Sequence, residues 1–117
     1  MFKVLAFLSK REDLSAEAFI DYYENKHIPF MMSLAPGPSL YKRLYFTRGT
    51  EMEAGNGSVD FDIVTKVGFP DRAAFDAWMA EVFKPGVAER VAEDEARFFD
   101  RSRSRSYVVV DERVTGG

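Results

Sequence analysis

The chain contains no cysteine and only one histidine among its 117 residues. Without thiols it can form no disulfide bond, no thiolate nucleophile and no metal or iron–sulfur site with sulfur ligands. A single imidazole is too few for the usual histidine-rich transition-metal site. Glycine-rich phosphate-binding motifs are also missing. We therefore expect no bound metal and no cofactor.

The chain also lacks an excess of positive charge and a long apolar run. Its net charge is −3, which gives no electrostatic reason to bind nucleic acid or an anionic membrane. The Arg-Ser repeat over residues 101–106 leads directly into a predicted strand, which argues against a disordered basic tail. No stretch approaches the ~20 apolar residues that cross a bilayer. The opening residues 1–9 lack a basic lead and a cleavage site, so they predict a strand rather than a signal peptide. We expect a cytoplasmic protein that binds neither nucleic acid nor membrane.

Hydrophobic residues make up 46% of the chain and aromatic residues 15%, which is typical of one globular domain spanning residues 1–117. Alternating or continuous apolar runs predict strands over 2–9, 40–48, 61–69 and 103–110, the last of them central or well covered. Helical periodicity predicts helices over 16–27, 30–35, 72–83 and 87–98, with Ser15 and Asp71 as N-caps. The loop over 49–58, which contains Gly55-Asn56-Gly57, predicts a hairpin connection.

This order of elements, β-α-β-β-α-(α)-β, is typical of a ferredoxin-like α+β fold with one antiparallel four-stranded sheet. Its helices cover a single face of the sheet. The opposite face would be bare, yet the predicted strands carry apolar side chains on both sides. We therefore expect a homodimer, with a small-molecule cavity between each sheet and its helices.

The only histidine, His27, lies in the most informative segment. Phe19, Tyr23 and His27 are spaced i, i+4, i+8 and share one helical face, and Pro29 predicts that the helix ends at His27. One interpretation is a helix-terminal histidine that caps free carbonyls. The other is a proton donor or acceptor at the rim of an apolar cavity.

Three blocks of sequence resemble the EthD family of dimeric α+β barrel proteins. They are residues 7–15, residues 19–29 with the Tyr-Tyr-Glu-Asn-Lys-His-Ile-Pro run, and residues 94–100. One departure is Tyr23, where the family often has tryptophan. The resemblance implies a homodimeric barrel with a small-molecule cavity. It also implies relatives associated with ether degradation alongside an oxygenase, and related barrels that act as polyketide cyclases, dehydratases, isomerases and cofactor-free monooxygenases.

The enzyme hypothesis assigns acid/base catalysis to His27, with Tyr23 as its catalytic partner. Tyr41, Asp62 and Phe30 are the predicted substrate-binding residues. The reaction would be dehydration, cyclisation, isomerisation or oxidation of an apolar or aromatic metabolite. The alternative is a non-catalytic ligand-binding or accessory protein, in which the same cavity holds an apolar ligand and His27 only caps the helix. Asp62 has a structural alternative of its own, pairing with Arg43 or Arg105 across the sheet. The charged residues of helix 87–98 are interpreted as a solvated surface: Glu89, Arg90, Glu93, Asp94 and Arg97.

Overall fold

The structure, a computed structural model, describes residues 1–53 and 60–117. Its strands are β1 (Phe2–Leu8), β2 (Leu40–Tyr45), β3 (Ile63–Phe69) and β4 (Arg105–Val108). Its helices are α1 (Ala16–Tyr22), α2 (Ile28–Leu34), α3 (Arg72–Val82) and α4 (Val87–Ala96), with a π-helical turn η1 (Tyr23–His27) and a 3-10 turn η2 (Arg101–Arg103). The predicted turn at Gly55-Asn56-Gly57 lies outside the described residues.

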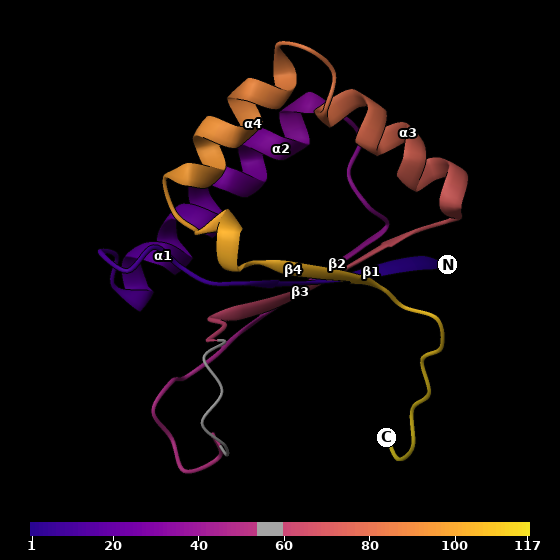
Figure 1. The fold of residues 1–117 in the computed structure, drawn as a ribbon. Coiled ribbons are helices and arrows are strands. Elements are labelled where there is room, and N and C mark those ends of the chain that lie inside the picture. Colours follow the sequence, from indigo (N-terminus) through magenta and orange to yellow (C-terminus); the bar gives the residue numbers. More distant parts are fainter. Residues whose placement is uncertain (54–59) are drawn as a thin grey trace.

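The strands form one sheet in the order β2-β3-β1-β4, and every neighbouring pair is antiparallel. All helices lie on one face of this sheet, and the segments that follow β2 and β4 extend away from its other face (Figure 1). This arrangement confirms the predicted ferredoxin-like α+β fold with helices on one face. No helix in the described part of the chain is long and apolar enough to cross a membrane.

The position of β4 corrects one prediction. Its β-branched run indicated a central or covered strand, but β4 is an edge strand that pairs only with β1. All four of its residues are exposed in the single chain, with Tyr107 and Val108 at 55% and 59%. β-propensity reports how well a side chain fits a pleated surface and does not distinguish an edge from a centre. The apolar side chains of β4 therefore form part of a surface that stays exposed to solvent in a single chain.

The first helix does not end at His27 as predicted. Helix α1 continues through η1 into α2, and Ile28 keeps helical dihedrals with φ −61° and ψ −49°. Pro29 has no N–H to give to a regular helix at this point, and it lies just after the π turn. The wider π turn before it, in which the Ile28 N–H donates to the Tyr23 carbonyl, replaces the regular bonding pattern at this point. His27 is therefore inside a helical rod and does not cap a helix end.

The buried core joins the helices to the sheet on one side of the molecule. Its main members are Phe19, Tyr23, Ile63, Phe98 and Phe99. The predicted N-caps are confirmed: Ser15 Oγ accepts a bond from the Ala18 N–H at 3.0 Å, and Asp71 Oδ1 accepts one from the Ala74 N–H at 2.8 Å. These caps set where α1 and α3 begin, so the aromatic faces of both helices point toward the sheet.

Candidate active site

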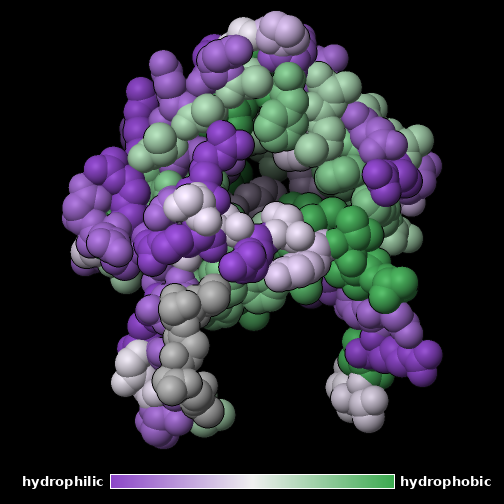
Figure 2. Space-filling model, viewed as in Figure 1, coloured by the Kyte–Doolittle hydropathy of each residue, from purple (hydrophilic) through white to green (hydrophobic). Residues whose placement is uncertain are grey.

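A cavity of about 370 Å³ lies between the helices and the covered face of the sheet. Figure 2 shows a hollow between the helices and the sheet, bordered by hydrophobic side chains. Its lining is mostly apolar and comes from nearly every element: Val4, Ala6, Leu8, Met31, Met32, Pro38, Val67, Phe69, Phe75, Trp78, Met79, Phe83 and Phe99. A cavity of this volume and composition suits a small apolar or aromatic molecule.

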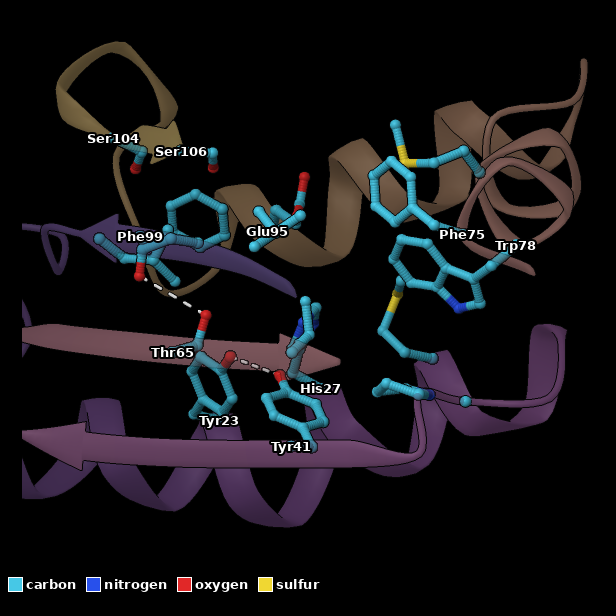
Figure 3. Close-up of a pocket in the computed structure, with 18 of the residues that line it drawn as sticks. Tyr23, His27, Tyr41, Thr65, Phe75, Trp78, Glu95, Phe99, Ser104 and Ser106 are labelled. Carbon is cyan, nitrogen blue, oxygen red and sulfur yellow. Dashed lines mark hydrogen bonds between the residues drawn. The ribbon is translucent and has the colours of Figure 1, made fainter. Parts of the chain in front are cut away.

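His27 lies in the wall of this cavity (Figure 3), and it forms a dyad with Asp94. The distance from His27 Nδ1 to Asp94 Oδ2 is 2.6 Å. The other oxygen, Asp94 Oδ1, accepts a hydrogen bond of 2.8 Å from the hydroxyl of Tyr22. His27 is 7% exposed and Asp94 6%. A carboxylate bonded to Nδ1 holds the ring orientation and favours the tautomer with its proton on that nitrogen.

The other ring nitrogen of His27 is available to a ligand. No buried side-chain nitrogen or oxygen of the described residues lacks a hydrogen-bond partner. Nε2 has no partner among these residues, so it must reach accessible space. Because His27 lines the cavity, that space is the cavity. The lone pair of Nε2 is therefore presented to whatever the cavity holds.

Two opposing effects set the charge of His27. Burial lowers its pKa below the ordinary value, and the hydrogen bond and charge of Asp94 oppose this only in part. The imidazole is therefore neutral at neutral pH, with its Nδ1–H donated to Asp94 and Nε2 free as an acceptor. This is the protonation state that a general base requires.

Tyr23 and Tyr41 place a pair of hydroxyl groups beside the histidine. Their oxygens are 2.5 Å apart, and the two side chains point toward one another in Figure 3. Both line the cavity. Burial raises the pKa of both hydroxyls, that of Tyr23 well above its ordinary value. The pair stays protonated, so one hydroxyl can bond the other while the remaining proton is free for an oxygen atom of a ligand.

An ion pair supports Tyr41 from outside the cavity. The guanidinium of Arg43 lies 4.9 Å from the centre of the Tyr41 ring. Glu24 holds that guanidinium with two hydrogen bonds of 2.6 and 2.9 Å, and it accepts a third, of 2.6 Å, from the hydroxyl of Tyr45. A guanidinium held at two points has little freedom to leave the ring, so the position of Tyr41 is constrained from behind.

Two predicted substrate-binding residues are not part of the cavity wall. The Asp62 carboxylate accepts a bond from the Lys10 N–H at 2.8 Å and pairs with Arg48 at 3.2 Å, rather than with either arginine that the sequence suggested. It precedes β3, in which Ile63 begins the alternation toward the helices, so Asp62 belongs to the opposite side. Phe30 packs against the guanidinium of Arg90 at 5.4 Å. The structure thus brings together His27, Tyr23 and Tyr41.

Asp94 corrects the interpretation of helix 87–98 as a solvated charged surface. It is buried, and it is the partner of His27. A periodic signal was present, because Val87, Val91, Asp94 and Phe98 follow the i, i+4, i+7, i+11 spacing of one helical face. Hydropathy alone assigned the carboxylate to solvent. Glu95, the next residue, was also missed and lines the cavity.

No three histidine, aspartate or glutamate side chains gather closely enough to hold a metal ion within the two described ranges. The polar side chains that line the cavity include the neutral imidazole, two tyrosine hydroxyls and the carboxyl group of Glu95, beside Thr65, Arg101, Ser104 and Ser106. The first four can accept or donate a proton. The chemistry that these side chains can supply is therefore proton transfer in an apolar surrounding.

Comparison with known proteins agrees with this fold. The EthD domain model matches residues 11–102, which is most of the chain. The chain belongs to the EthD domain family. No curated protein matches the sequence.

Solved structures show the same fold at low sequence identity. An EthD family protein from Bacillus halodurans is 18% identical, with a TM-score of 0.61 over 96% of this chain and 100% of that one. HapK from Hahella chejuensis is 18% identical, with a TM-score of 0.60 over the whole of both chains. A dimeric ferredoxin-like protein from Thermobifida fusca is 7% identical, with a TM-score of 0.55 over 92% of this chain and 88% of that one.

Proposed function

We propose that this EthD-family protein catalyses acid/base chemistry on an apolar or aromatic small molecule, without a cofactor, and that His27 is the proton acceptor. One observation supports this above all others. The Nδ1 atom of a buried neutral histidine is bonded to Asp94 at 2.6 Å, while Nε2 is open to an apolar cavity. A histidine that only packs in a core has no need for a carboxylate on one nitrogen and free space at the other.

The proposed reaction begins at a carbon next to a carbonyl group. His27 Nε2 takes a proton from that carbon, and the resulting imidazolium is stabilised by the Asp94 carboxylate. The negative charge moves to the carbonyl oxygen, which accepts a hydrogen bond from the Tyr23–Tyr41 pair. Phe75 and Trp78, whose rings stack 6.4 Å apart, hold the apolar part of the molecule. The enolate can then lead to dehydration, cyclisation or isomerisation.

Hydrogen exchange tests the proposal without knowledge of the natural substrate. The protein is incubated in D2O with a panel of aromatic ketones, and deuterium entering the carbon next to the carbonyl is followed by NMR. Wild type should catalyse exchange on at least one ketone, and His27→Gln should not. Lys26→Gln is the matched control, because Lys26 is the exposed neighbour of His27.

The alternative function, ligand binding without turnover, predicts a different outcome. A panel member would then change the fluorescence of Trp78, which lines the cavity, while deuterium entered at the uncatalysed rate. The apolar lining favours this function as much as it favours catalysis. Binding without exchange on every ketone would therefore replace the enzyme proposal with a binding or accessory role.

We also propose that two copies pair through the uncovered face of the sheet. Leu44, Tyr107 and Phe46 are 55%, 55% and 39% exposed in the single chain. Phe7 and Tyr107 lie on the same surface, with ring centres 6.2 Å apart. Apolar side chains gathered on one sheet face are costly to leave in water. Support also comes from the dimeric ferredoxin-like protein of Thermobifida fusca.

A further inference from the structure

Glu95 is the acidic side chain of the cavity that the reaction described above does not use. It comes from α4 and lines the cavity with His27 (Figure 3). Its side chain is 19% exposed, and its ionic partner among residues 1–53 and 60–117 is the Arg101 Nε at 3.4 Å. That arginine is 53% exposed, so water screens the pair. Glu95 lines the cavity, and its carboxyl group is not sealed from accessible space, so a ligand in the cavity can reach it.

The neighbouring carboxylates Asp94 and Glu95 have different environments. Asp94 accepts two hydrogen bonds, from His27 and Tyr22, so both of its oxygens are occupied. Burial raises the pKa of Glu95, the charge of Asp94 adds to the effect, and Arg101 opposes it. Glu95 thus holds a proton to a higher pH than an exposed glutamate does. Adjacent acids with such different surroundings are suited to different roles.

We propose that Glu95 is a second catalytic residue of this cavity, the general acid that protonates a substrate hydroxyl group as it leaves as water. The inference rests on the proposed function, because it needs His27 to take the proton from the neighbouring carbon. It narrows the substrate to a β-hydroxy carbonyl compound with an apolar or aromatic end. It also narrows the reaction to the elimination of water.

The step balances with the groups present. The C–H bond breaks, its proton goes to His27 Nε2, and its electron pair forms the carbon–carbon double bond. The C–O bond breaks, and the oxygen leaves as water with the proton of Glu95. His27 is then protonated and Glu95 ionised, and a proton passes from the imidazolium to the carboxylate through solvent. Nothing is oxidised or reduced.

The shape of the lining agrees with such a substrate. Figure 3 draws Phe75 and Trp78 on one side of His27, and Ser104 and Ser106 on the other. An aromatic ring can lie against the first pair, while hydroxyl and carbonyl oxygens find donors among the polar side chains. A hydroxyl group beside Glu95 and a C–H group beside His27 can then belong to adjacent carbons of one molecule.

The probe is the aldol adduct of benzaldehyde and acetone, a β-hydroxy ketone that loses water to give benzalacetone. In D2O, Glu95→Gln should lose far more of its rate of water loss than of its rate of deuterium exchange next to the carbonyl. Its rate of water loss should fall about 100-fold or more, the usual contribution of a general acid. The acetate ester of the adduct should react equally fast with both proteins, because acetate leaves without a proton. Glu93→Gln, an exposed change on the same helix, is the matched control.

The other outcomes overturn the inference. An equal fall with adduct and ester would mean that Glu95 has only a structural role, and an unchanged rate with the adduct would place the acid elsewhere. If the wild-type protein exchanged no deuterium, the proposed function itself would be refuted, and the role of Glu95 with it. If Glu95→Gln does not fold, Glu95→Ala is assayed with added formate. Water loss should then increase with formate, and no increase overturns the proposal.

Discussion

Asp94 stabilises the fold and also orients His27. Replacing Asp94 with asparagine should separate these two roles. The side chains have the same shape, but two charge-assisted hydrogen bonds, of 2.6 Å to His27 and 2.8 Å to Tyr22, become neutral ones. Bonds to charged groups contribute about 1 kcal/mol more than neutral bonds, so the two together should cost about 2 kcal/mol. For a domain of this size that is a fall in melting temperature of about 8 °C. Deuterium exchange should fall further, by up to about 10⁴-fold, because the favoured tautomer of the base is lost.

Calorimetry and the NMR exchange assay measure the two effects in the same samples. Glu93→Gln is the control, since it removes one carboxylate from the exposed side of the same helix. NMR titration should also show a lower His27 pKa in Asp94→Asn than in wild type, because Asp94 is the group that raises it. If Asp94→Asn matched Glu93→Gln in melting temperature and His27 pKa, the dyad would not exist in solution. Asp94 would then not orient His27, and the proposed proton acceptor would be ruled out.

Three further predictions concern pH, the tyrosine pair and the dimer. The folded-state pKa of His27 lies below the 6.5 of an exposed histidine, so the unfolded chain takes up this proton first. The free energy of unfolding should therefore fall as pH drops below 6.5, and urea titrations of His27→Gln should lack this component. Tyr23→Phe and Tyr41→Phe each remove one end of the same hydrogen bond. In a double-mutant cycle they should show a coupling of about 1 kcal/mol, and fully additive effects would contradict the bond. Leu44→Lys should convert dimers to monomers in light scattering, whereas Met52→Lys, also at an exposed apolar residue, should not; a monomeric wild type would rule out the proposed dimer.

Much of the covered side of the fold can be predicted from local patterns. The i, i+4, i+8 spacing of Phe19, Tyr23 and His27 correctly places all three on a buried face. This works because a helix repeats its faces whatever the tertiary structure does. The position of Tyr41 could be predicted in a similar way. Side chains alternate between the two faces of β2, and this alternation directs Tyr41 toward the helices.

Residues whose burial depends on distant partners could not be found in this way. Asp94 is buried because His27, 67 positions earlier, compensates for the loss of water around its charge. A hydropathy scale scores each residue without its tertiary partners, so it predicts that such a carboxylate is exposed to solvent. The continuation of the helix through Pro29 was missed for a related reason, since it depends on the unusual turn over Tyr23–His27.

That π turn has a consequence at the level of the gene. It holds one residue more than a regular helical turn, so the loss of one codon, for instance that of Asn25, would restore an unbroken α-helix. The regular turn left behind would span nearly the same rise and rotation as the π turn, because a π turn is a helical turn with one residue inserted. Met31 would therefore stay in the cavity wall, and His27 would keep facing Asp94. A descendant one codon shorter over Tyr23–His27 should keep both the fold and the geometry of the site.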